Sequence, residues 1–190
     1  LIYTDKYGAD KITMDKLAQY LCSGKIVGVM HGNSEVGARA LGNRSILAYP
    51  AYPDMKEKIN IIKNREFYRP FAPVVRADDM SRFFVFNGES PYMSFAPKIS
   101  VDWYDKVPAV VHQDGTSRVQ SVTREQNVFL YHVLCEIEKI SKIPMLLNTS
   151  FNIKGKPILT TIEDAIEVLE TTQIDAVLIE GYLFTKKLTR

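Results

Sequence analysis

The sequence lacks the features that would make it a membrane protein or a disulfide-stabilised one. No apolar run approaches the roughly 20 residues needed to cross a bilayer, and the opening segment LIYTDKYGAD lacks the basic and then apolar layout of a signal peptide. Only two cysteines occur, Cys22 and Cys135, far apart and each within a helical pattern, so neither a disulfide framework nor a metal-binding pair is predicted. We expect a soluble, cytoplasmic protein whose cysteines are buried as small hydrophobic side chains.

A strong excess of charge of one sign is also lacking. The chain carries 24 Lys and Arg against 22 Asp and Glu, a net charge of +2, and 46% of its residues are hydrophobic. This composition is that of an ordinary globular domain, and the charge is too small to predict binding to nucleic acid. We expect one domain over residues 1–190. Because residue 1 is leucine, we also expect it to belong to a longer chain whose N-terminal domain is absent here.

What the sequence does have is an alternation of helical and strand-like segments. Apolar positions at helical spacing predict helices over Asp10–Ser23, Pro53–Lys63, Arg124–Lys142 and Thr161–Thr172. Short apolar, β-branched runs predict strands over Lys25–Met30, Ser45–Tyr49, Phe71–Arg76, Pro144–Asn148 and Ala176–Ile179. Pro73 would lie at an edge or a bulge, and residues 83–110 would form a long loop or irregular strands. These mixed elements predict an α/β sandwich with a twisted, mixed sheet.

The first candidate binding segment is a loop in which two glycines, Gly37 and Gly42, alternate with two arginines. It begins at Gly37, just after a predicted strand, and places Arg39 and Arg44 five residues apart. Glycine lets backbone amides approach a ligand closely, and the planar guanidinium group matches phosphate or carbamoyl oxygens. We therefore predict an anion-binding loop. The alternative is that these arginines pair with neighbouring carboxylates.

Three further cations gather where the second predicted helix ends. Lys63, Arg65 and Arg69 are spaced by two and four residues, and Pro70 and Pro73 stiffen the chain beyond them. A single cation at this place would be explained by the helix dipole. Three cations at this spacing predict a segment that wraps around a triphosphate.

Polar residues mark the end of a buried strand. Asn148, Ser150 and Asn152 occupy alternate positions, which places them on one face of the strand. Their amide and hydroxyl groups could hold phosphate oxygens, a magnesium ion or an adenine edge. The alternative is a polar turn whose side chains cap its own backbone.

A tight Asp-Gly turn forms the last candidate segment. The turn lies within HQDGTSRVQ and presents His112 and Arg118 on its two limbs. Arg118 adds another cation to the predicted site. A lone histidine is most often structural, so we assign His112 no specific role.

Four segments occur in a fixed order: GARALGNRSILA, MKEKINIIKNREFYRPFAPVV, HQDGTSRVQSV and PMLLNTSFNIKGKPI. Together they resemble the C-terminal domain of the O-carbamoyltransferases that modify nodulation factors and antibiotics, over residues 20–185. The chain is more distantly similar to the threonylcarbamoyl-adenylate synthase (YrdC) family, in the Lys-x-Arg of residues 63–65 and the Thr-Ser-x-Asn of residues 149–152. The resemblance implies a YrdC-like α/β sandwich.

The resemblance also implies a reaction in two steps. Carbamoyl phosphate is hydrolysed, and the carbamate attacks the α-phosphate of ATP, in the presence of Mg²⁺, to give carbamoyl adenylate and pyrophosphate. An N-terminal actin-like domain of the same protein, which in the family holds Fe²⁺, would then transfer the carbamoyl group to a hydroxylated small-molecule acceptor such as a sugar or a secondary metabolite. Neither a membrane nor a nucleic acid is expected as a partner.

Residue roles follow from the same resemblance. The positions that match the family's ligand-contacting residues are Arg39, Lys63, Arg69, Arg118, Asn148 and Ser150, with Arg44, Arg65 and Asn152 as further candidates. Lys63 and Arg69 would neutralise the triphosphate. Arg39 and Arg118 would hold the carbamoyl group, and the polar strand end would fix the nucleotide and its magnesium. Displacement at phosphorus needs such positioning and positive charge rather than a protein nucleophile.

Two other functions stay open. The chain could be a catalytically inactive YrdC-like module that binds RNA or regulates a partner, which tRNA binding with a steep salt dependence and no nucleotide affinity would indicate. It could also be a free-standing threonylcarbamoyl-adenylate synthase. Pyrophosphate release supported by threonine and bicarbonate would select that function.

Overall fold

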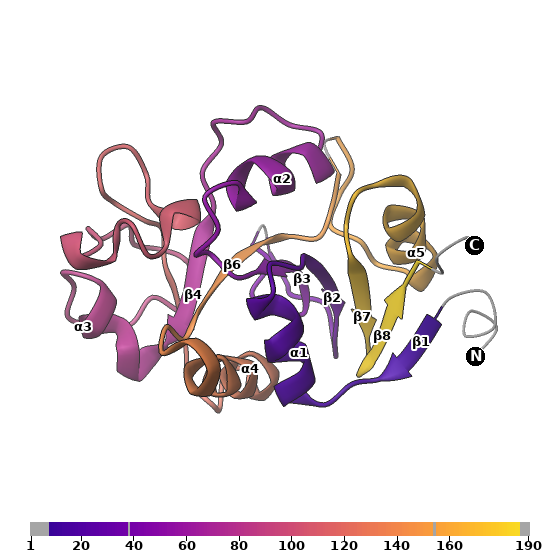
Figure 1. Cartoon of the computed structure of the whole chain (residues 1–190), viewed down its shortest axis with the longest axis horizontal. Coiled ribbons are helices and arrows are strands. Elements are labelled where there is room, and N and C mark those ends of the chain that lie inside the picture. The colour runs from indigo at the N-terminus through magenta and orange to yellow at the C-terminus, as the bar shows by residue number, and fades with distance from the viewer. Residues whose placement is uncertain (1–7, 38, 154, 187–190) are drawn as a thin grey trace.

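In the computed structural model, residues 8–37, 39–153 and 155–186 are described, and they build a mixed sheet with helices on both faces (Figure 1). The strands are β1 Gly8–Lys11, β2 Val27–Met30, β3 Arg44–Ala48, β4 Ala72–Arg76, β5 Gln120–Val122, β6 Met145–Ser150, β7 Ala176–Ile179 and β8 Tyr182–Thr185. Their order across the sheet is β1-β8-β7-β2-β3-β6-β4-β5. β2 runs parallel to β7 and β4 parallel to β5, while the other neighbours are antiparallel. The predicted α/β sandwich with a mixed sheet is confirmed.

Two helices cover each face of the sheet. The helices are α1 Met14–Cys22, α2 Met55–Ile62, α3 Met80–Phe83, α4 Val128–Ser141 and α5 Ile162–Thr171, with short 3-10 turns at Ala77–Asp79, Val101–Trp103 and Pro108–Val110. The apolar faces of α1 and α4 share one core with Val27 and Val29 of β2, and those of α2 and α5 share the other with Ile46 and Ala48 of β3. This alternation along each strand produces two separate cores. Within the described residues, no helix is long and apolar enough to span a membrane.

Both ends of the described chain differ from the prediction. The first helix does not begin at Asp10, because Gly8–Lys11 forms β1 and pairs antiparallel with β8. Neither β1 nor β8 was predicted, because their pairing joins opposite ends of the sequence. Gly24, with φ +86°, follows Ser23, the C-cap residue of α1. The cysteines, predicted to be buried, are both partly exposed.

The middle of the chain departs from the prediction in two places. β4 is an interior strand between β6 and β5, so the prediction of an edge for Pro73 holds only locally: β5 pairs with β4 from Val74 onward and does not reach Pro73. The segment 83–110 contains two 3-10 turns and a bridge between Phe84 and Ile99, so it is not one long loop. The unpredicted strand β5 follows it.

The later helices follow their predicted places with shifted starts. The side chain of Asn127 accepts a hydrogen bond from the amide of Leu130 and so starts α4 at Val128. Thr161 and Asp164 form a reciprocal capping box at the start of α5. In both helices a polar side chain at the N-terminus determines where the helix begins.

The centre of the sheet holds the end of β6 in place. Asn148 of β6 pairs with Leu47 of β3 on one side and with Ala72 of β4 on the other. Beyond the strand, Phe151 is fully buried, and its ring lies over Gly28 of β2. A Cβ atom at position 28 would lie 2.3 Å from the Cζ atom of that ring, so only glycine fits there.

We predict that Gly28→Ala destabilises the protein by about 1–3 kcal/mol, because the added methyl group overlaps the ring of Phe151. Urea unfolding monitored by circular dichroism measures the change. The same substitution should cost clearly less in a Phe151→Leu background, where the ring is gone. Equal unfolding midpoints for the wild type and Gly28→Ala would contradict the packing described here.

Candidate functional site

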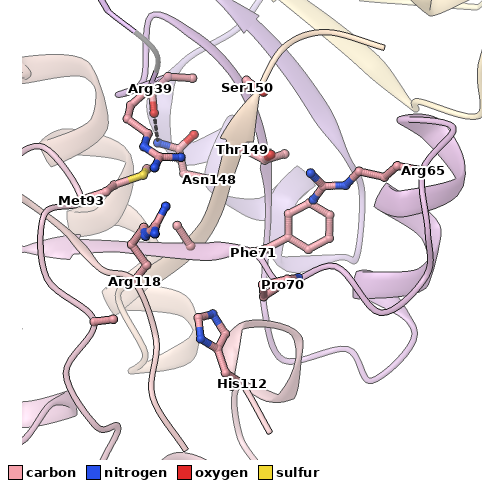
Figure 2. Close-up of a pocket in the computed structure, with 13 residues that line it drawn as sticks. Arg39, Arg65, Pro70, Phe71, Met93, His112, Arg118, Asn148, Thr149 and Ser150 are labelled. Atoms are coloured by element: carbon pink, nitrogen blue, oxygen red, sulfur yellow. Dashed lines mark hydrogen bonds between the residues drawn. The ribbon is translucent and has the colours of Figure 1, made fainter. Parts of the chain in front are cut away.

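A cavity of about 410 Å³ lies where the end of β6 and the start of β4 meet surrounding loops (Figure 2). We call it the main cavity, and its lining residues are Arg39, Ala40, Arg65, Pro70, Phe71, Ala72, Met93, Ala96, His112, Arg118, Asn148, Thr149 and Ser150. Figure 2 shows Arg39, Met93 and Arg118 on one side and Arg65 with Phe71 on the other. Because its described lining includes three arginines and no carboxylate, the cavity is suited to an anion.

A smaller cavity of about 300 Å³ shares Arg65 and Ser150 with the main cavity. We call it the side cavity, and its other lining residues are Lys63, Glu66, Arg69, Asn152 and Gly155. The Nε atom of Arg69 lies 3.1 Å from Oε2 of Glu66, and the Arg69 side chain is 55% exposed. An exposed ion pair contributes little stability, so this guanidinium group can turn toward a ligand at low cost.

Eight of the nine residues predicted to bind ligands line these two cavities, although their binding roles stay predictions. They come from segments far apart in the sequence, which the fold brings together. Arg44 is the exception and lines neither cavity. Its Nη1 atom donates to the backbone carbonyl groups of His31 at 3.3 Å and Asn43 at 2.8 Å, so it stabilises the loop after β2.

Arg65 is held in place by its neighbours, and one of its hydrogen-bond donors remains unused. Its Nε atom donates to Oδ1 of the buried Asn60 at 2.6 Å, and its guanidinium carbon lies 4.4 Å from the centre of the Phe71 ring. Its Nη2 atom is buried and has no hydrogen-bond partner among the described residues. Burial above all, together with the charge of Arg69, lowers the pKa of Arg65 to about 10, so the group remains charged at neutral pH. A fixed cation with an unused donor is suited to bind a phosphate oxygen.

Lys63 is the most buried cation of the two cavities, with an exposed fraction of 4%. Its Nζ atom donates to the backbone oxygens of Ser150 and Asn152, to Oγ of Ser150 at 3.2 Å and to Oδ1 of Asn152 at 2.8 Å. Burial, with a smaller contribution from Arg65, lowers the pKa of Lys63 to about 7. The ammonium group therefore holds the end of β6 against the end of α2, in addition to lining the side cavity.

The two limbs of the Asp-Gly turn both reach the main cavity. His112 and Arg118 line it together, as Figure 2 shows. Gly115, at φ +75°, allows the turn, and the carboxylate of Asp114 accepts hydrogen bonds from the amide and hydroxyl groups of Thr116. Burial lowers the pKa of His112, which favours the neutral imidazole at neutral pH. His112 thus belongs to the cavity wall, which the sequence around it did not indicate.

The loop after β2 binds an anion of its own. Oε1 of Glu35 accepts hydrogen bonds from the amides of Leu41 at 2.7 Å, Asn43 at 2.7 Å and Arg44 at 3.4 Å. The prediction that glycine exposes these amides to a ligand is therefore wrong for these three groups. At Gly42 the reason for glycine is packing, because a Cβ atom there would lie 2.4 Å from Leu130 Cδ1. The loop contributes a side chain, that of Arg39, to the main cavity.

Three residues at the site had no signal in the sequence. Asn60 orients Arg65, Glu35 organises the loop, and Gln120 hydrogen-bonds to Asn148 below the main cavity. Asn60 lies in the middle of a helix and Gln120 in an unpredicted strand, so neither stands out locally. Only the carboxylate at position 35, close before a glycine-rich loop, could have been suspected of capping its amides.

The chain is similar to known proteins over most of its length. The family model described as carbamoyltransferase C-terminus matches residues 18–186. The chain belongs to this family. It is 40% identical over 176 residues to nodulation protein NolNO of Sinorhizobium fredii and 41% identical over 172 residues to nodulation protein U of Rhizobium tropici. Each match covers 90% of this chain but only 26% and 29% of the respective relative.

Solved structures of low sequence identity share the fold. YciO of E. coli has a TM-score of 0.64 at 14% identity, covering 90% of this chain and 78% of that one. Sua5 of P. abyssi, complexed with L-threonine, has a TM-score of 0.61 at 15% identity, covering 88% and 46%. Full-length HypF in a phosphate- and nucleotide-bound form has a TM-score of 0.59 at 17% identity, covering 92% and 26%. The predicted YrdC-like fold is confirmed.

The buried ammonium group leads to a prediction about pH. Below pH 7 Lys63 is protonated in both the folded and the unfolded chain. Between about 7 and 10.5 the folded chain releases this proton while the unfolded chain keeps it, so the unfolded chain binds more protons. The free energy of unfolding of the wild type relative to Lys63→Met should therefore rise with pH across this window, by a few kcal/mol at most.

Urea unfolding at several values between pH 6.5 and 10 measures this difference. Lys58→Met is the matched control, because the Lys58 side chain is 50% exposed and pairs with Asp54 on the surface. Its difference from the wild type should stay flat over the same range. A flat or falling difference for Lys63→Met would show that the ammonium group stays charged in the folded protein.

Proposed function

We propose that this chain is the ATP- and carbamoyl-phosphate-binding part of an O-carbamoyltransferase and that it forms carbamoyl adenylate. Membership of the carbamoyltransferase C-terminus family supports the transferase class. The fold-related HypF, solved with phosphate and nucleotide bound, is a precedent for such ligands on this fold. The chain's own residues provide the specific argument.

The observation that carries the proposal is the set of guanidinium groups around the main cavity. Arg39, Arg65 and Arg118 line it, without a carboxylate among its described lining residues. Arg65 has a buried donor left without a partner among those residues. Two adjoining cavities of about 410 and 300 Å³ offer room for a nucleotide and a small acyl phosphate.

In the proposed reaction, water replaces the phosphate group of carbamoyl phosphate, which gives carbamate and inorganic phosphate. A carbamate oxygen then bonds to the α-phosphorus of ATP, and the bond from that phosphorus to the bridging oxygen breaks. Pyrophosphate leaves with the electron pair. Arg39 and Arg118, which lie on one side of the main cavity, would hold the carbamoyl donor, while Arg65 and Arg69 would bind the triphosphate.

Lys63 has a positioning role in this scheme. Its ammonium group fixes Ser150 and Asn152 at the wall of the side cavity, and a triphosphate nearby would favour its protonated form. Mg²⁺ would be carried by the phosphate oxygens of ATP and would neutralise part of their charge. The described residues contain no group of three or more His, Cys, Asp or Glu side chains that could hold a metal ion.

Transfer to the acceptor forms the second half of the proposal. The chain spans less than a third of the two nodulation proteins, so we propose that an N-terminal actin-like domain, with Fe²⁺, binds the hydroxylated acceptor. The cytoplasm is the proposed location, because ATP is available there.

The proposed activity predicts that pyrophosphate is released from ATP and Mg²⁺ only when carbamoyl phosphate is present. Arg118→Ala should lower this rate about a hundredfold, because it removes a preorganised cation from the reacting groups. Arg124→Ala is the matched control, since Arg124 is exposed and lines neither cavity. A coupled assay for pyrophosphate measures all three proteins.

Other outcomes would replace the proposal. Pyrophosphate release that requires threonine and bicarbonate would identify a threonylcarbamoyl-adenylate synthase. No nucleotide affinity, together with tRNA binding that weakens steeply with salt, would identify an RNA-binding module. Equal loss of activity in Arg124→Ala and Arg118→Ala would separate the activity from the main cavity.

A further inference from the structure

Two buried amide side chains are hydrogen-bonded to each other at the main cavity. Asn148 of β6 is 1% exposed and Gln120 of β5 is 3% exposed. Nδ2 of Asn148 donates to Oε1 of Gln120 at 2.7 Å and to the backbone oxygen of Ala40 at 3.2 Å. Nε2 of Gln120 donates to the backbone oxygen of Leu41 at 3.0 Å. The pair thus connects β6, β5 and the loop that carries Arg39.

The two backbone carbonyl groups fix which way both amides point. A carbonyl oxygen only accepts hydrogen bonds, so Gln120 must direct its NH₂ group toward Leu41 and its oxygen toward Asn148. Asn148 must then direct its own NH₂ group toward Gln120 and Ala40. Turning the Asn148 amide over would place its oxygen against two other oxygens.

The remaining oxygen of Asn148 belongs to the wall of the main cavity. Asn148 lines the main cavity. Figure 2 shows its amide nitrogen hydrogen-bonded to a backbone oxygen, that of Ala40, and its amide oxygen pointing away from this hydrogen bond. This Oδ1 atom is buried and has no hydrogen-bond partner among the described residues. A buried acceptor without a partner is unfavourable, so a ligand that brings an N–H group there gains affinity.

We infer that Asn148 accepts a hydrogen bond from the NH₂ group of the carbamoyl donor, and that Gln120 is the positioning residue that keeps Asn148 an acceptor. This rests on the proposed function. Asn148 lies beside Arg39 in Figure 2, with Arg118 on the same side of the cavity, and these cations suit the oxygens of the same ligand. The site therefore selects acyl phosphates that carry an amino group over those that carry a methyl group of similar size.

Acetyl phosphate is the probe for this selection, because a methyl group takes the place of the amino group. The wild-type chain should bind carbamoyl phosphate about tenfold more tightly than acetyl phosphate in calorimetric titrations. Gln120→Met keeps the size of the side chain but neither accepts from Asn148 nor donates to Leu41, so only the backbone oxygen of Ala40 still orients the Asn148 amide. In this variant the ratio of the two affinities should fall by about fivefold.

Two comparisons separate positioning from a general structural effect. Gln120→Glu still offers an oxygen to Nδ2 of Asn148 and should retain the wild-type ratio, even if both affinities change. Gln19→Met, on the exposed side of α1, should leave both affinities and their ratio unchanged. A structural role alone would alter melting temperature without altering the ratio.

The adenine amino group is the other N–H donor that Asn148 could accept. The ratio of ATP to ITP affinity tests it, because ITP has an oxygen at that position. This ratio should be the same in the wild type and in Gln120→Met, and a fall would assign Asn148 to the nucleotide and overturn the inference.

The affinities of the wild-type chain for carbamoyl phosphate and acetyl phosphate show whether the proposed function or only the role of Asn148 fails. Binding of neither acyl phosphate would refute the proposed function. Equal binding of both would overturn the selection by Asn148 while leaving the proposed function standing.

Discussion

The buried ammonium group of Lys63 holds the site together. It joins the end of α2 to the end of β6 by donating to four oxygens of Ser150 and Asn152. Without it, Ser150 and Asn152 would lose their hydrogen bonds to the segment that carries Arg65. Burial makes the charged form costly and lowers the pKa of Lys63 to about 7, even though its partners are the residues that form the cavity wall. Local stability and the geometry of the site therefore depend on the same contacts.

The arginines of this protein fall into two groups with different surroundings. Arg76 and Arg82 are paired with carboxylates: Arg76 with Asp79 at 2.6 Å and with Glu138 at 2.7 Å, and Arg82 with Glu138 at 3.2 Å. These pairs connect α4 to the segment after β4. The main cavity instead combines three arginines with no described carboxylate in its wall. This contrast supports the proposal that the cavity arginines bind a ligand.

Sequence patterns predicted which residues line the cavities better than they predicted the hydrogen bonds among those residues. The alternation of Asn148 and Ser150 at a strand end and the spacing of Lys63 and Arg65 after a helix correctly placed these residues around connected cavities, because both are local properties. The hydrogen bond between Gln120 and Asn148 joins positions 28 residues apart and depends on two short strands on either side of β4. No local pattern contains that information.

For the fold, too, local patterns were predicted correctly and contacts between distant segments were missed. The central strands carry continuous apolar runs and were predicted correctly. β1 and β8 were missed because their pairing connects opposite ends of the sequence. The amides of the loop after β2 were predicted to approach a ligand, but three of them donate to the carboxylate of Glu35 instead. A carboxylate six residues before Leu41 accepts the hydrogen bonds that a ligand would need, and the spacing of the residues does not reveal this.

The central claim is that one connected pair of cavities binds the triphosphate of ATP. A crystal structure of the chain with Mg²⁺ and the non-cleavable analogue α,β-methylene-ATP tests it most directly. The account predicts phosphate oxygens within hydrogen-bond distance of Arg65 and along the wall formed by Ser150. A nucleotide bound outside both cavities, with Arg65 unchanged and without a phosphate partner, would contradict it.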